Sequence, residues 1–307
     1  MTRIVEDRLA TENPDIIVIS QVQNFPLLED VTFKEPVILE QFEVGTIWNR
    51  VVRPRGYQKI TRAMTRSIWS HYLSERLGDI DGISVPSERE RDILLGLLSR
   101  GDHTGKCVAL IPNGIDAEYT VGPSVMKDPA TLVYQGSLKF AANLDAMEFF
   151  LSEIMPLIQQ HSPHIVLRIT GRFDGVDLSR IRGNASVELT GYISDVSDTV
   201  SAATVCVIPL RFGSGTRIKA LESMALGTPV VSTAKGVEGI DVEDGVHLLI
   251  ADEPDLFASH VIRLLVDADL GRELAKKARQ LVLEKYTWSQ LGKQFSDFCE
   301  SFSLSKK

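Results

Sequence analysis

The sequence has no long hydrophobic run and few cysteines. No stretch approaches the roughly 20 apolar residues that a membrane-spanning helix needs. The N-terminal segment carries acidic residues where a secretory signal would have its apolar core. The 3 cysteines, Cys107, Cys206 and Cys299, stand far apart and form no CxxC pair. These absences predict a cytoplasmic protein without a disulfide framework or structural zinc.

An excess of basic residues is also lacking. The chain has 41 acidic residues against 33 lysines and arginines, which gives a formal net charge of −8. This balance argues against nucleic-acid partners, which select strongly basic surfaces, but it leaves room for a local basic pocket. No G-x-G-x-x-G opens a strand-to-helix turn, which disfavours a dinucleotide-dependent dehydrogenase or a sugar-nucleotide epimerase.

Short β-branched runs alternate with amphipathic stretches from about residue 130 onward. The strand candidates are TLVYQG, HIVLRITG, SVELTG, TVCVIPL, PVVSTA and HLLIA. This alternation is typical of a doubly wound parallel sheet. Several of these strands end in glycine or proline, at Gly136, Gly171, Gly191 and Pro209. Because open α/β sheets bind ligands at the carboxyl ends of their strands, we expect the site at this edge.

Residues 1–120 repeat the pattern more weakly, in DIIVIS, PVILEQ, GISVPS and CVALIPNG. We therefore predict an N-terminal α/β domain over 1–120 and a second over 121–286. A last helix within 287–307 is expected to pack across the domain junction. The stretch 113–130 contains glycine and two prolines and few large apolar residues, which indicates the linker.

Segment 205–231 runs from a buried strand through a glycine-rich turn into an amphipathic helix. The turn consists of Gly213, Ser214, Gly215 and Thr216. Backbone N–H groups at a helix N-terminus suit a phosphate or diphosphate, and glycines permit close approach. Arg211, Arg217 and Lys219 would add positive charge, and Glu222 could accept hydrogen bonds from ribose hydroxyls. Glycines also serve to make tight corners, and Glu222 could equally be a solvated helix residue, so both interpretations stay open at this point.

The C-terminal half resembles glycosyltransferase family 4, in the subgroup with a GGTRLKxLEAMAxGxPVV-like signature. Here that signature reads GSGTRIKALESMALGTPVV. It is accompanied in order by YQGSLKFAANLDAMEFF, RITG, ELTGYISD, STAKGVEGI and KYTW, over residues 107–290. The resemblance implies a GT-B fold, in which two Rossmann-like domains with parallel sheets face each other across a cleft.

The same resemblance implies a retaining transfer of sugar from a nucleotide-diphosphate sugar to a glycan, lipid or small-molecule acceptor. Neither a metal nor another cofactor is expected, and Arg211, Lys219 and Glu222 are expected at the catalytic centre. The resemblance places donor binding at Gly136, Ser137, Lys139, Gly191, Tyr192, Ile193, Gly213, Ser214, Gly215, Thr216 and Arg217.

Ser137 and Ser214 stand where members of the family often carry Arg and Glu. These departures favour an alternative hypothesis, a non-catalytic or regulatory homologue that binds nucleotide or a partner transferase. Residues 1–12 are predicted to end a helix whose preceding strands are missing, so the N-terminal domain is expected to be incomplete. A bare apolar edge on the strand Asp15–Ser20 would then favour self-association. Peripheral membrane contact is left open.

Overall fold

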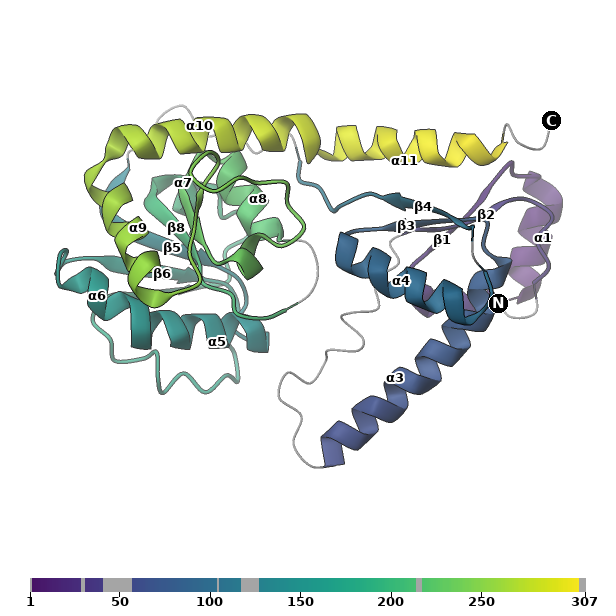
Figure 1. Ribbon diagram of the computed structural model, residues 1–307, viewed down its shortest axis with the longest axis horizontal. Helices are drawn as coiled ribbons and strands as arrows, with labels where there is room; N and C mark the ends of the chain where they lie inside the picture. Colours follow the sequence, from purple (N-terminus) through teal and green to yellow (C-terminus); the bar gives the residue numbers. More distant parts are fainter. Residues whose placement is uncertain are drawn as a thin grey trace. The chain divides into compact units, whose positions relative to one another are not determined.

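Figure 1 shows the computed structural model, which describes residues 2–28, 31–40, 57–103, 105–116, 127–213 and 217–303. The described residues form two compact units. One holds the chain up to Asn113 and again from Gln290, and the other holds Gly114–Gly213 and Arg217–Ser289. Each unit contains a sheet whose strands all pair in parallel, which confirms the predicted α/β class.

The first unit has a 4-stranded sheet in the order β1-β2-β3-β4. Its strands are β1 (Ile17–Ser20), β2 (Val37–Glu40), β3 (Gly82–Val85) and β4 (Cys107–Leu110), and each lies within one predicted run. The helical segments are α1 (Thr2–Glu12), η1 (Val22–Leu28), α3 (Tyr57–Arg76), η2 (Leu77–Asp79) and α4 (Glu88–Arg100). The helix expected over residues 1–12 is therefore present as α1.

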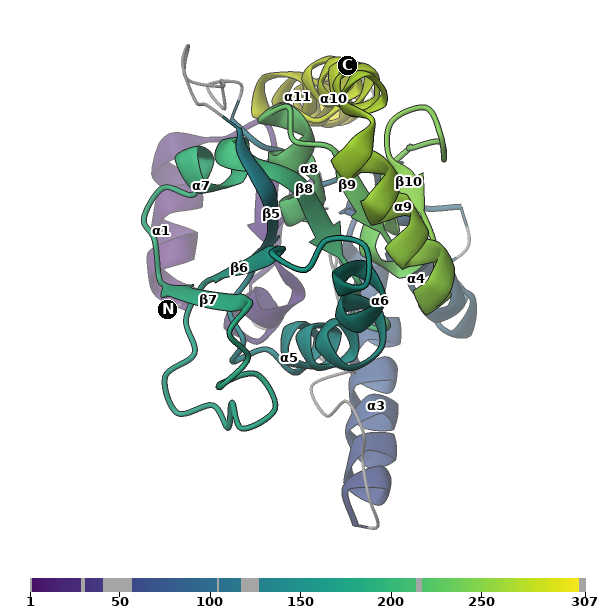
Figure 2. The same ribbon diagram turned by 90° about the vertical axis from the view of Figure 1, so that its left-hand side faces the viewer.

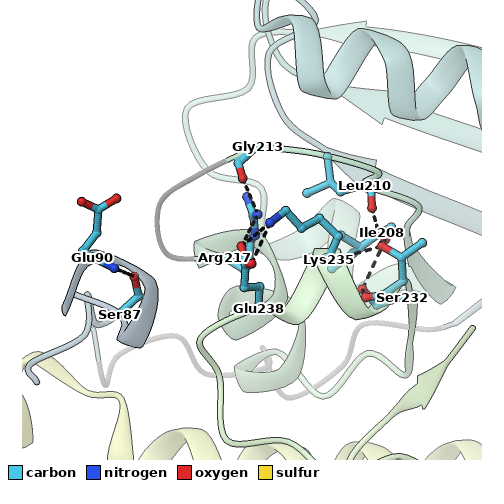
Figure 3. Close-up of polar contacts among 11 residues, drawn as sticks. Ser87, Glu90, Ile208, Leu210, Gly213, Arg217, Ser232, Lys235 and Glu238 are labelled. Atoms are coloured by element: carbon cyan, nitrogen blue, oxygen red, sulfur yellow. Dashed lines mark hydrogen bonds and ion pairs between the residues drawn. The ribbon is translucent and has the colours of Figure 1, made fainter. Parts of the chain in front are cut away.

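Helix α4 begins at a capped turn and buries one side. The Ser87 side-chain oxygen accepts a hydrogen bond from the Glu90 backbone N–H at 3.3 Å, as Figure 3 shows. Such a cap satisfies one of the unpaired amides of the first turn. Leu94 and Leu97 then follow at helical spacing and are buried in the core of this unit. The edge strand β1 exposes Val18, with 45% of its surface accessible.

The second unit has a 6-stranded sheet in the order β10-β9-β8-β5-β6-β7. Its strands are β5 (Asp128–Gln135), β6 (Val166–Thr170), β7 (Val187–Gly191), β8 (Ala203–Ile208), β9 (Val230–Ser232) and β10 (Leu249–Ile250), in agreement with the predicted runs. The helical segments are α5 (Ala141–Phe149), η3 (Phe150–Ile154), α6 (Met155–Gln159), α7 (Ser197–Ala202), α8 (Ile218–Ala225), η4 (Ala234–Val237), α9 (Pro254–Val266) and α10 (Ala268–Lys285).

Helices cover both faces of this sheet. Figure 2 shows α5, α6 and α9 on one face, with α7, α8 and α10 on the other. The strands are consequently buried on both sides, which is why they are nearly continuous apolar runs. Because β5 and β8 are neighbours at the centre of the sheet, the loops that follow them meet at its carboxyl edge.

Helix α11 (Trp288–Ser303) confirms the predicted last helix. Its Phe302 ring lies against β3, where a Cβ atom added to Gly82 would come within 2.5 Å of the ring. There is therefore no room for a side chain at this position of β3. Part of the predicted linker, residues 117–126, lies outside the described residues.

Candidate functional site

At the carboxyl end of β5, the backbone of the loop that follows this strand packs closely against the backbone of the loop after β6. Gly136 follows the strand with a φ of +144°, a conformation that favours glycine, and its N–H donates to the Thr170 carbonyl at 3.1 Å. Gly171, after β6, has a φ of +111°. A Cβ atom on Gly171 would lie 2.6 Å from the Gly136 carbonyl carbon. The two loops thus pack backbone against backbone.

The ammonium of Lys219 lies beneath this loop. Its Nζ donates to the Tyr134 hydroxyl at 2.7 Å and to Asn143 Oδ1 at 2.9 Å. The Tyr134 hydroxyl itself donates to Asn143 Oδ1 at 2.7 Å, and Asn143 Nδ2 donates to the Ser137 carbonyl at 2.9 Å. A Cβ atom on Gly136 would come within 2.9 Å of Nζ. Three elements, β5, α5 and α8, therefore hold one cation against the Gly136 loop.

Burial shifts the protonation equilibria of this cluster. It lowers the pKa of Lys219 to about 7, because the charged form loses hydration, and it raises the pKa of Tyr134 well above its usual value. Arg217 also lowers the pKa of Lys219, whereas Glu222 and Cys206 oppose the shift. An anion bound beside Nζ would favour the protonated form, so this lysine is suited to meet a phosphate.

Arg217 stands at the N-terminus of α8 and is buried, with 6% of its surface accessible. Its guanidinium donates to the Gly213 carbonyl at 3.2 Å and to Glu238 at 3.3 Å, as Figure 3 shows. Arg217 thereby ties the first residue of the glycine-rich turn to the C-terminal end of η4. The predicted phosphate contacts at Ser214, Gly215 and Thr216 lie outside the described residues.

The structure pairs Arg211 with a carboxylate. Its guanidinium makes a bidentate contact with Asp145, at 2.9 Å and 2.7 Å, and lies 4.5 Å from the centroid of the Phe149 ring. A phosphate at Arg211 would have to share or displace this carboxylate. Glu222 is half-buried on α8, close enough to act on the pKa of Lys219. Its expected contact with a ribose stays a prediction.

The loop after β7 presents an aromatic surface. Gly191 has a φ of +77°, and its carbonyl accepts from the Gly171 N–H at 2.8 Å. Tyr192 is exposed, with 66% of its surface accessible, and the Arg172 guanidinium lies 5.0 Å from the centroid of its ring. Ile193 beside it is half-buried. This arrangement offers a flat ring and backbone polar groups to a planar ligand.

Ser137 and Lys139 differ in their surroundings. The Ser137 hydroxyl donates to the Arg172 carbonyl at 3.0 Å, which links the loops after β5 and β6. Lys139 is exposed, and its backbone N–H donates to the Ser137 hydroxyl at 3.4 Å. Ser137 therefore fixes the loop, and the Lys139 side chain extends into solvent.

Sequence reasoning missed Tyr134, Asn143 and Glu238. Tyr134 and Asn143 have ordinary places in a strand and a helix, and nothing in their spacing from Lys219 indicates contact. The described residues contain no group of three or more His, Cys, Asp or Glu that could hold a metal ion. In the same part of the chain no helix is long and apolar enough to cross a membrane.

Residues 129–267 match the family described as Glycosyl transferases group 1. The chain is 27% identical over 163 residues to an uncharacterized 44.6 kDa protein in the cps region of Klebsiella pneumoniae, which is 50% of this chain and 42% of that protein. It is 29% identical over 98 residues to the lipopolysaccharide 1,2-N-acetylglucosaminetransferase of Salmonella typhimurium, 31% of this chain and 26% of that enzyme. The chain thus spans less than half the length of either relative.

The crystal structure of Anabaena HepE in complex with UDP and glucose is similar in fold. Its TM-score is 0.72 at 14% sequence identity, over 97% of this chain and 81% of that one. Together with the two parallel sheets, this similarity establishes a GT-B fold with two Rossmann-like domains. Residues 129–267 therefore resemble the family of Glycosyl transferases group 1, in a chain with the GT-B fold.

Proposed function

We propose that this protein transfers a sugar from a nucleotide-diphosphate sugar to a glycan acceptor, in the assembly of a polysaccharide. The observation that carries the proposal is the Lys219 ammonium, held by Tyr134 and Asn143 against the Gly136 loop. This cation lies inside the segment that matches the glycosyl transferases group 1 family.

In the proposed reaction, the bond between the anomeric carbon and the diphosphate oxygen breaks and its electron pair stays on the diphosphate. An acceptor hydroxyl oxygen bonds to the anomeric carbon, with retention of configuration, and the proton of that hydroxyl passes to the leaving diphosphate. Lys219 donates a charge-assisted hydrogen bond to the leaving diphosphate, which stabilises the charge that develops there. We propose that fixed cations serve this purpose without a metal ion.

We propose that the nucleoside binds at the loop after β7. Tyr192 presents an exposed ring that a base can stack on, and Arg172 already lies over that ring. The Gly136 loop lies two strands away in the sheet, after β5. A nucleoside diphosphate would then extend along the carboxyl edge, from β7 toward β5 and β8.

The relatives guide the choice of probes and acceptor. Anabaena HepE was crystallised with UDP and glucose, so UDP is the first nucleotide to test. The Salmonella typhimurium relative is a lipopolysaccharide N-acetylglucosaminetransferase, which supports a glycan acceptor. The Klebsiella pneumoniae relative comes from a cps region.

Calorimetry with UDP, GDP and ADP in the presence of EDTA tests the proposal. We expect at least one nucleotide to bind without added metal, and Lys219→Met to weaken that binding about tenfold or more, because a charge-assisted bond is lost. Lys277→Met is the matched control, since Lys277 makes an exposed ion pair with Glu273 on α10. Absence of heat and of a thermal shift with all three nucleotides would refute the donor site.

A further inference from the structure

A pocket of about 510 Å³ opens beside the proposed diphosphate site, at the carboxyl ends of β8, β9 and β10. Its polar lining comes from Arg211, Thr233, Lys235, Glu238 and Asp252. Its volume lies in the usual range of small-molecule sites. Apart from Arg211, which is also expected to contact the diphosphate, this lining takes no part in the proposed contacts to the nucleoside and the diphosphate.

The charged groups of the pocket are already held in place. Glu238 accepts from Lys235 Nζ at 2.6 Å and 2.7 Å, and Arg217 donates to the same carboxylate at 3.3 Å, as Figure 3 shows. Asp252 accepts the Ala234 backbone N–H at 2.9 Å. The lining is thus preorganised before a ligand arrives, which lowers the cost of binding.

The pattern of charge selects the class of ligand. Arg211 and Lys235 bring two positive charges, and Glu238 and Asp252 bring two negative ones. A phosphate would meet both carboxylates, which is unfavourable. Hydroxyl groups instead donate to carboxylates and accept from ammonium and guanidinium groups, so a neutral polyol matches all four. A sugar ring is a ligand of this kind.

The Glu238 carboxylate can accept a further hydrogen bond, from a ligand hydroxyl. An ionised carboxylate offers about four acceptor positions, and the described contacts from Lys235 and Arg217 use three of them. Its side chain is 36% accessible, in contrast to the 7% of Arg217. The carboxylate therefore lies between a buried cation and the pocket, where a hydroxyl can reach it.

The order of the strands puts this pocket on the far side of the diphosphate from the nucleoside. The order β9-β8-β5-β6-β7 places β7 and Tyr192 on one side of β5, and β8 and β9 on the other. From β5 to β9 is two strand spacings, roughly 10 Å. A donor that extends from Tyr192 past Gly136 and Lys219 would bring its sugar to the pocket.

We propose that this pocket binds the sugar of the nucleotide-diphosphate donor, and that Glu238 is a specificity-determining residue that accepts a hydrogen bond from a sugar hydroxyl. The inference rests on the proposed function, because it places the sugar relative to the diphosphate. It adds a subsite, with a named carboxylate, to that function.

The test compares a nucleoside diphosphate with its glucose conjugate, by calorimetry on the full chain. The pairs are UDP with UDP-glucose, GDP with GDP-glucose and ADP with ADP-glucose. We expect Glu238→Gln to weaken binding of the conjugate about tenfold, because a bond to a charged acceptor is lost, and to leave the nucleoside diphosphate within about twofold. Retained binding of the nucleoside diphosphate also shows that the variant is folded.

Two further variants keep the test decisive. Glu238→Asp preserves the charge opposite Arg217 but withdraws the carboxylate from the pocket, so it should show the same selective loss even if Glu238→Gln fails to fold. Glu273→Gln, on the exposed pair with Lys277, should change neither affinity. Equal effects of the Glu238 variants on both ligands, or no effect on either, would overturn the sugar subsite and leave the nucleotide site standing. Failure of the unmodified protein to bind any nucleotide would instead remove the proposed function, and the subsite with it.

Discussion

Lys219 and Tyr134 meet in two ways, because the lysine Nζ lies 2.7 Å from the tyrosine hydroxyl and 4.1 Å from the centroid of its ring. The ring thus faces the cation while the hydroxyl oxygen accepts a hydrogen bond from it, and both contacts compensate part of the hydration that burial removes. The remaining cost of burial lowers the pKa of Lys219 to about 7. The charge of this group consequently depends on what binds to the Gly136 loop.

Affinity for a nucleoside diphosphate should fall as the pH rises from 7 to 9. Free Lys219 loses its proton above a pKa of about 7, and a bound anion raises that pKa, so binding takes up a proton in this range. The affinity should fall by up to about tenfold per pH unit until the pKa of the complex is reached. Calorimetry in buffers of different ionisation enthalpy measures the proton uptake directly. The Lys219→Met variant should give a much flatter profile, and an equally flat profile for the unmodified protein would contradict the prediction.

The cations and Glu222 should contribute unequally to nucleotide binding. We expect Lys219→Met and Arg211→Met to weaken binding more than Glu222→Gln, since charge-assisted contacts to phosphate exceed one hydroxyl contact of about 1 kcal/mol. Between the two cations, Lys219 should matter more, because Arg211 is already paired with Asp145. Titrations of the three variants give the order directly. A larger loss for Glu222→Gln would mean that the diphosphate lies elsewhere.

Gly171→Ala should both destabilise the protein and weaken nucleotide binding. Its Cβ atom would come within 2.7 Å of the Ser137 backbone nitrogen, so the Gly136 loop must move, and we expect a cost of about 3 kcal/mol or more. Gly175→Ala is the matched control, because Gly175 also has a positive φ, of +74°, but a Cβ atom there meets nothing within 4 Å. That variant should lose only about 1 kcal/mol and keep its affinity. Chemical denaturation and calorimetry on both variants separate backbone strain from displacement of the loop, and equal losses would refute the close contact.

Strand β1 should support self-association. It is an edge strand of the described sheet, and Val18 exposes 45% of its surface there. Val18→Lys places a charge on this edge and should reduce the apparent mass in light scattering at high concentration. The exposed substitution Leu95→Lys, on α4, controls for added charge alone. A monodisperse monomer before any substitution would show that the edge does not pair.

Much of the fold could be predicted from the sequence, because local pattern specifies it. The ten described strands were each predicted from a short β-branched run, and α11 was predicted as a last helix within 287–307. Local pattern did not predict the π-helical turn η3 that lies between α5 and α6. A single turn of this kind shifts the pattern of apolar residues by about one position, which is too small a change to be read from the sequence.

The sequence by itself determined which segments form strands and helices, that glycines end β5 and β7, and that a lysine follows the glycine-rich turn. Only the tertiary structure decided the surroundings of these residues. Tyr134, Asn143 and Lys219 come from three elements, and it is the pairing of β5 with β8 that brings them together. The same holds for Arg211 with Asp145 and for Arg217 with Glu238. The physical reason is that local pattern reports burial and backbone conformation, whereas the partner of a charged group depends on which elements pack side by side.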